Sequence, residues 1–143
     1  MEAVEAYLAL GSNMGDRRAN ISKALEMISA LPGTSLERVS DTMESAADGF
    51  DGPDFLNCCC AVRTSLAPNA LLSALKDIER ALGRTDEGIV VDSEGKRVYK
   101  DRTMDIDILT YGDMEIMTGK LQIPHPRMKE RGFVMKPLGQ IMK

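Results

Sequence analysis

The sequence predicts an α+β fold of the ferredoxin-like, split βαβ type, in which helices pack on an antiparallel sheet. Two observations carry this prediction. Short strand-like apolar runs and two segments of helical apolar periodicity follow one another in the order β-α-β-β-α-β, with extra strands at the end. Turn residues separate these segments. No repeat or low-complexity linker divides the 143 residues, so we expect one domain over residues 1–143.

The elements of the first half follow from local signals. Residues 7–10 are a short apolar run that ends at Gly11-Ser12-Asn13, which indicates a strand entering a tight turn. Apolar residues at helical spacing predict a helix from Asp16, the expected N-cap, to Leu31. A weak strand at 34–42 and a loop at 44–54 follow. A loop of this length is unusual in a compact domain and indicates a function.

Similar local signals predict the elements of the second half. Residues 55–64 have strand character, and a helix begins at Pro68 and is closed by Gly83. Residues 84–101 form a second long, charged loop. We then expect a strand at 103–111, a hairpin around Gly112-Asp113 and a short helical stretch in the tail.

Composition excludes several classes of protein. A net charge of -4 does not favour a general nucleic-acid binder. The N-terminus lacks the features of a secretion signal, and no run approaches the roughly 18 apolar residues of a membrane span. Adjacent residues on a strand point to opposite faces, so Cys58-Cys59-Cys60 suits neither a disulfide framework nor a zinc site. We expect buried, reduced thiols and a cytoplasmic protein.

Asp105 and Asp107 are the strongest candidates for chemistry. Side chains two apart on a strand share a face, with backbones roughly 6.6 Å apart. Two such carboxylates repel each other, and Mg²⁺, which binds one or two carboxylates together with phosphate oxygens, compensates them. The alternative is the solvent face of an amphipathic strand, although Asp is a poor strand former.

Basic residues surround these aspartates in the sequence. Arg102 stands three residues before Asp105 and follows a cluster formed by Lys96-Arg97 and Lys100. Such cations suit phosphate, although a solvated loop also explains the cluster. His125, the only histidine, lies between two prolines and six residues before Arg131. Both a structural role and a phosphate contact remain open for it.

Four segments together resemble the 6-hydroxymethyl-7,8-dihydropterin pyrophosphokinases of folate biosynthesis. They are Ala9-Leu10-Gly11-Ser12-Asn13, Pro53-Asp54-Phe55-Leu56-Asn57, the run Arg102-Thr103-Met104-Asp105-Ile106-Asp107-Ile108-Leu109, and the run from Pro124-His125-Pro126 to Arg131-Gly132-Phe133. They occur in the order of the family and span nearly the whole chain. The resemblance implies transfer of the pyrophosphoryl group of ATP to the hydroxymethyl oxygen of the pterin, with release of AMP.

The resemblance also implies roles for individual residues. Asp105 and Asp107 would hold two Mg²⁺ ions and, with Arg102, form the catalytic set. The ATP-binding residues would be Glu79, Arg84, Arg102, His125 and Arg131. Asn57 would pair with the edge of the pterin, Phe133 would stack on it, and Phe55 would lie beside that pocket.

The same resemblance makes the loops at 44–54 and 84–101 lids over the substrates. In the second loop, Lys100-Asp101 replaces the family's usual Gly-Pro, and Tyr99 is a substitute for a tryptophan that some members have. The partners would be small molecules, without nucleic acid or membrane. The oligomeric state stays open, with a monomer favoured. The alternatives are an RNA-binding sheet of the same fold, another magnesium-dependent phosphotransferase or nuclease, and a paralogue that binds nucleotide without turnover.

Overall fold

The computed structural model describes residues 3–46, 54–83, 104–126 and 128–142. Within these ranges the chain forms a five-stranded sheet, a separate two-stranded sheet and three α-helices. In chain order the elements are β1 (Val4–Ser12), α1 (Arg17–Ser29), β2 (Thr34–Val39), β3 (Met43–Ser45), β4 (Phe55–Thr64), α2 (Pro68–Ala81), β5 (Asp105–Tyr111), β6 (Ile116–Met117), β7 (Gln122–Ile123), the 3₁₀ turn η1 (Met128–Glu130) and α3 (Gly132–Ile141).

The main sheet has the strand order β2-β4-β1-β5, and the short strand β3 pairs with the remaining part of β4. All of these pairings are antiparallel. The connection from β1 through α1 leads to β2, which is separated from β1 by β4. This is the split βαβ arrangement, so the predicted α+β, ferredoxin-like fold is confirmed.

Helices α1 and α2 begin where the sequence predicts. The Asp16 side chain accepts a hydrogen bond from the Ala19 amide at 3.1 Å and caps α1, and Pro68 is the first residue of α2. Gly33 and Gly83, with φ of 60° and 100°, follow the two helices in a backbone conformation that favours glycine. Within the described ranges, no helix combines the length and the apolar character that crossing a membrane requires.

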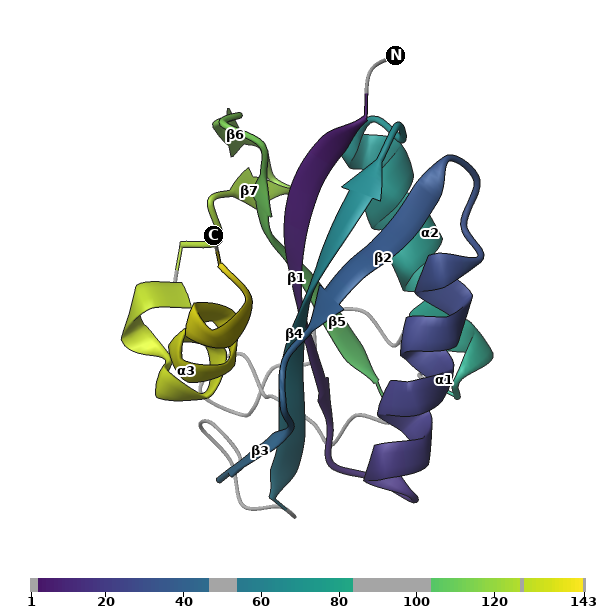
Figure 1. The fold of residues 1–143 in the computed structure, drawn as a ribbon, viewed down its shortest axis with the longest axis vertical. Helices are drawn as coiled ribbons and strands as arrows, with labels where there is room; N and C mark the ends of the chain where they lie inside the picture. The colour runs from purple at the N-terminus through teal and green to yellow at the C-terminus, as the bar shows by residue number, and fades with distance from the viewer. Residues whose placement is uncertain (1–2, 47–53, 84–103, 127, 143) are drawn as a thin grey trace, which may run out of the picture.

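The two faces of the sheet bury two separate clusters of apolar residues. Helices α1 and α2 cover one face and α3 covers the other, as Figure 1 shows. Successive residues of a strand point to opposite faces, so Leu8 and Leu10 of β1 join the first cluster, whereas Tyr7 and Ala9 pack against the second. The candidate site lies on the α3 face, at the end of the sheet that carries Gly11 and Asp105.

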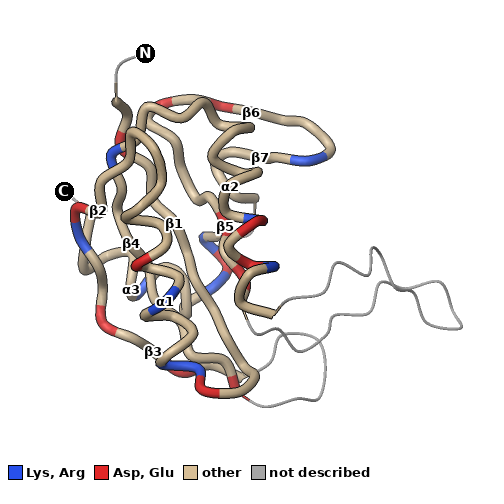
Figure 2. Tube along the Cα trace, turned by 90° about the vertical axis from the view of Figure 1, so that its right-hand side faces the viewer, with Lys and Arg blue, Asp and Glu red and all other residues tan. Residues whose placement is uncertain are grey.

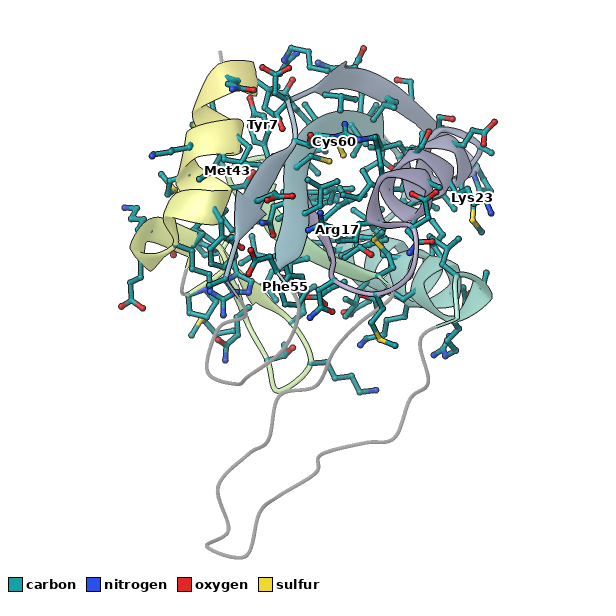
Figure 3. All side chains as sticks on the ribbon, turned by 90° about the horizontal axis from the view of Figure 1, so that it is seen from below. Tyr7, Arg17, Lys23, Met43, Phe55 and Cys60 are labelled. Carbon is teal, nitrogen blue, oxygen red and sulfur yellow. The ribbon has the colours of Figure 1, made fainter. Side chains whose placement is uncertain are left out.

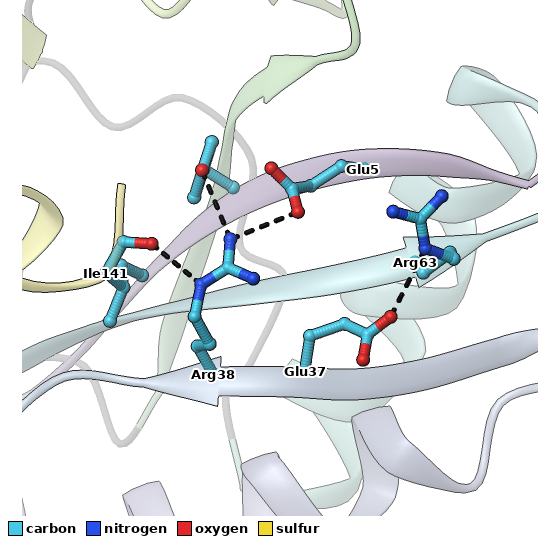
Figure 4. A network of polar contacts seen from close by, with 6 residues as sticks. Glu5, Glu37, Arg38, Arg63 and Ile141 are labelled. Carbon is cyan, nitrogen blue, oxygen red and sulfur yellow. Dashed lines mark hydrogen bonds and ion pairs between the residues drawn. The ribbon is translucent and has the colours of Figure 1, made fainter. Parts of the chain in front are cut away.

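Polar contacts fix the C-terminal end of α3 to the sheet. Arg38 of β2 donates from Nε to the Ile141 carbonyl at 2.8 Å and from Nη2 to the Glu5 carboxylate at 3.0 Å (Figure 4). The hydrogen bond to Glu5 raises the pKa of Arg38. A cation at the last carbonyls of a helix interacts favourably with the helix dipole. Arg38 therefore joins α3, β1 and β2.

Two local predictions are wrong. The hairpin expected around Gly112-Asp113 does not form with β5; in the described part of the chain β6 pairs with β7 instead. The Gly112 amide donates to the Glu5 carbonyl at 2.8 Å, so the chain turns beside β1 rather than back along β5. The loop expected at 44–54 starts later, because Glu44 and Ser45 belong to β3; its residues 47–53 lie outside the described ranges.

Candidate active site

The two aspartates of β5 lie on one face of the sheet, as predicted. Asp105 is paired with Gly11 of β1 and Asp107 with Ala9, and both aspartates are half-buried. Ile106, between them, points to the opposite face and belongs to the core under α1 and α2. Figure 2 draws the acidic residues of β5 in red. Two carboxylates on a strand, partly shielded from water, are a donor set that Mg²⁺ accepts when phosphate oxygens complete its coordination.

A row of three paired positions crosses one end of the main sheet. Asn57 of β4 is paired with Gly11 of β1, and Gly11 is paired with Asp105 of β5. Paired residues of antiparallel strands project to the same face. Asn57 and Asp105 therefore stand on one face, two strand spacings or about 10 Å apart. Gly11, which has no side chain, lies between them.

The amide of Asn57 is held in a fixed orientation. Its Nδ2 donates to the Met43 carbonyl at 3.0 Å and to Ser45 Oγ at 2.9 Å, and the residue is 6% exposed. The amide oxygen points toward Gly11, since a Cβ added there would lie 3.2 Å from Oδ1 and 3.4 Å from Phe55 Cδ1. Two of the predicted pterin-binding residues thus lie together beside Gly11, at the end of the sheet seen from below in Figure 3.

His125 lies beside β5. Its backbone amide donates to the Leu109 carbonyl at 2.9 Å, which places residue 125 along the strand that carries the aspartates. The imidazole Nε2 is 4.0 Å from Asp107 Oδ2, too far for a hydrogen bond but close enough for an ion pair when the ring is protonated. The structure thus brings together the predicted metal ligand Asp107 and the predicted phosphate-binding His125.

Arg131 and Phe133 lie at the start of α3. The guanidinium carbon of Arg131 is 5.6 Å from the centroid of the Phe133 ring, the geometry of a cation–π contact. Phe133 packs against the cluster that α3 forms with Cys59 of β4. Arg131 and Phe133 therefore lie over the same face of the sheet as Asn57 and Asp107.

Glu79 approaches the aspartates from the opposite side of β5. It is 5% exposed on α2, and its Oε2 accepts a hydrogen bond from the backbone amide of Ile106 at 2.7 Å. This contact joins Glu79 to the residue between Asp105 and Asp107. Glu79 therefore holds the backbone of β5 between its two aspartates.

Several predicted residues lie outside the described ranges. These are Arg84, Arg102, the cations Lys96, Arg97 and Lys100, and the whole of the loop 84–101. Within the ranges that the structure describes, no three His, Cys, Asp or Glu side chains gather as a ready-made metal site. The two aspartates alone fit an ion whose remaining ligands come from phosphate and water.

The three cysteines are free and buried, as the sequence predicts. Desolvation raises the pKa of Cys58 and of Cys59 to about 12, and that of Cys60 well above its ordinary value. The thiolate is the nucleophilic form of cysteine, so these thiols are inert at neutral pH. All three belong to the buried core on the two faces of the sheet.

Sequence reasoning missed the role of Gly11. It assigned Gly11 to a turn, whereas the structure extends β1 to Ser12 and puts Gly11 inside the strand. A glycine inside a strand often marks a place where another group approaches the backbone closely. That signal was available in the sequence, but the neighbours Asn57 and Phe55 become visible only in the fold.

A ferredoxin-like sheet that carries two half-buried carboxylates with a histidine beside them is suited to phosphoryl-group transfer. The family model for 7,8-dihydro-6-hydroxymethylpterin-pyrophosphokinase matches residues 7–143. The chain belongs to this family. The predicted family and the predicted function, pyrophosphoryl transfer to hydroxymethyldihydropterin in folate biosynthesis, are confirmed.

Individual relatives agree with this assignment. A 2-amino-4-hydroxy-6-hydroxymethyldihydropteridine pyrophosphokinase of Porphyromonas gingivalis is 42% identical over 137 residues, which cover 94% of this chain and 88% of the relative. The protein of the same name from Bacillus subtilis is 39% identical, with 95% and 77% covered. A crystal structure of an HPPK-DHPS in complex with substrates superposes with a TM-score of 0.68 at 15% identity, covering 97% of this chain and 40% of that one, and supports the fold.

Proposed function

We propose that the pyrophosphoryl donor is ATP, that two Mg²⁺ ions are required, and that AMP is the second product. The observation that carries this proposal is the row Asn57–Gly11–Asp105, which places an amide and a carboxylate on either side of a glycine gap. An acceptor at Asn57 and a polyphosphate at Asp105 would then lie next to each other. Enzymes of phosphoryl transfer work chiefly by such positioning and by charge stabilisation.

In the proposed step the hydroxymethyl oxygen bonds to the β-phosphorus of ATP. The bond from this phosphorus to the oxygen that bridges it to the α-phosphate breaks, and that oxygen leaves on AMP while the hydroxyl proton passes to solvent. Magnesium, held by Asp105 and Asp107, would neutralise the phosphate oxygens. Arg102, outside the described ranges, completes the proposed catalytic set.

The remaining roles divide between the two substrates. We assign Glu79, Arg84, His125 and Arg131 to ATP. This is supported for His125 by its 4.0 Å approach to Asp107. We assign Asn57, Phe55 and Phe133 to the pterin. For Asn57, the position of its amide oxygen next to Gly11 supports this assignment. Bonds from Nδ2 fix the amide, and its oxygen can accept hydrogen bonds from the pterin edge.

We propose further that the chain acts as a single domain over residues 1–143, as a monomer in the cytoplasm, on small molecules rather than on nucleic acid or membranes. Free, buried cysteines are consistent with a reducing compartment. The face that an RNA-binding sheet would use carries Asp105 and Asp107, whose charge repels a phosphate backbone.

The test is a product assay with the purified chain, ATP, MgCl₂ and 6-hydroxymethyl-7,8-dihydropterin. Chromatography should show AMP and the pterin diphosphate in equal amounts, and no AMP when the pterin or magnesium is left out. ADP as the product, or turnover of ATP without the pterin, would contradict the proposal. Binding of ATP without any product would identify a paralogue that has lost turnover.

A further inference from the structure

Arg17, the first residue of α1, makes two contacts that neither the sequence nor the family assignment explains. Its Nη1 donates to the Asp54 carbonyl at 2.9 Å, and its Nη2 donates to Glu44 Oε1 at 2.8 Å. Asp54 directly precedes β4, and Glu44 is the central residue of β3. One side chain from the helix layer thus holds two strands at the end of the sheet that carries the candidate site. Arg17 and Phe55 are labelled at this end in Figure 3.

The register of β3 shows how this contact reaches the site. Glu44 is paired with Leu56, a residue of the core beneath α1, so the Glu44 side chain lies on the α1 side of the sheet. Its neighbours Met43 and Ser45 are paired with Asn57 and Phe55, on the opposite side. Arg17 therefore holds β3 from behind the face that we assign to the pterin.

On the face opposite Glu44, the same strand β3 orients Asn57. Both acceptors of its amide, the Met43 carbonyl and Ser45 Oγ, belong to β3. Strand β3 has only three residues and, among the described strands, pairs only with β4, so its backbone ladder is short and side-chain contacts add to what holds it. A displacement of β3 would remove both acceptors and release the Asn57 amide.

We infer that Arg17 is a positioning residue for the pterin: by holding Glu44 and Asp54 it keeps β3 where it orients the Asn57 amide. The inference rests on the proposed assignment of Asn57 to the pterin. Contacts to a charged guanidinium are short and directional, and here one fork spans two strands. The Arg17 and Glu44 side chains are 30% and 61% exposed, so their ion pair adds little to global stability. Its effect should therefore be confined to the site.

The test compares the two substrates in steady-state kinetics. Arg17→Ala should raise the KM for the pterin by about three- to fivefold and change the KM for ATP by less than about twofold, with an unchanged urea midpoint. Arg17→Lys, which keeps the charge but loses the fork, should fall between Arg17→Ala and the wild type. Arg18→Ala is the matched control, because Arg18 is an exposed arginine at the next position of α1. It should behave like the wild type.

Glu44→Ala provides a second route if Arg17→Ala folds poorly. It should raise the KM for the pterin in the same direction, and the double variant should be less impaired than the sum of the two single effects. Asn57→Ala tests the underlying assignment: without an effect on the pterin KM, the pterin site itself is misplaced. If Asn57→Ala impairs pterin use while Arg17→Ala impairs neither substrate, or both equally, the inference about Arg17 is wrong.

Discussion

The carboxylate of Glu79 on α2 accepts a hydrogen bond from the backbone amide of Ile106 on β5 at 2.7 Å. Among the described strands, β5 pairs only with β1 and forms the edge of the main sheet, so its outward amides need acceptors other than a strand. Ile106 stands between Asp105 and Asp107, so a buried acid on a helix holds the stretch of strand that presents both candidate metal ligands.

Glu79→Ala should destabilise the protein. The variant leaves the Ile106 amide without its acceptor, and a buried donor without a partner costs about 1–3 kcal/mol. Urea unfolding measures the change, and Glu79→Gln, which keeps an oxygen acceptor, should lose less. Arg80→Ala is the control: Arg80 is exposed and pairs only at the surface with Asp77, so we expect a change below about 0.5 kcal/mol. If Glu79→Ala is as stable as the wild type, the Glu79–Ile106 hydrogen bond contributes nothing to the free energy of unfolding.

Asp105→Asn and Asp107→Asn should each lower kcat by about a hundredfold or more while the fold persists. Both side chains are half-buried and project from the sheet beside the proposed polyphosphate, so their charge is needed for the metal rather than for packing. Rates at saturating magnesium, with circular dichroism as the check on folding, measure this. Asp113→Asn, in the exposed turn after β5, should leave kcat unchanged. Near-normal turnover by either variant would refute the metal assignment for that residue.

Gly11→Ala should weaken the use of the pterin. The added methyl group would lie 3.2 Å from Asn57 Oδ1 and 3.4 Å from the Phe55 ring, where it crowds the proposed pterin contacts. We expect the KM for the pterin to rise by about fivefold or more, with little change for ATP. Gly119→Ala is the control, because nothing lies within 4 Å of a methyl group there. Equal effects of the two substitutions would mean that the gap above Gly11 is not used.

The cysteines predict a specific dependence of stability on alkaline pH. Burial raises the pKa of Cys58 from 9.0 to about 12, so the unfolded chain releases this proton at lower pH than the folded chain. Protonated Cys58 therefore contributes fully to the free energy of unfolding below pH 9, and this contribution is lost as the pH rises toward 12. Urea unfolding between pH 8 and about 11 should show a shallower decline for Cys58→Ala than for the wild type, by up to about 1.4 kcal/mol per pH unit.

A thiol reagent gives an independent measure of the same burial. At pH 8 in native buffer the three thiols should react far more slowly than in urea, because all three are buried. Rapid labelling of the folded protein would show that the cluster opens to solvent, and the alkaline prediction would then fail as well.

Some features of the site followed directly from local sequence. The alternation of acids and aliphatic residues from Asp105 to Leu109 fixes which side chains share a face, because the side-chain period of a strand is two. The Asp16 cap and Pro68 fix the helix starts in the same way. The hairpin around Gly112 was wrong for a related reason: a turn signal shows that the chain bends, but not which strand it then meets.

The sequence alone thus predicted the class of fold and the family, and it singled out the two aspartates as candidate metal ligands, since each of these depends on residue types at short spacing. Only the tertiary structure decided which residues lie close together. It places Asn57 and Asp105 on either side of Gly11, and it brings Glu79 to Ile106 and Arg17 to Glu44 and Asp54. These contacts join residues that are distant in the chain. They depend on the register between strands and on helix packing, which the whole core sets and no local pattern specifies.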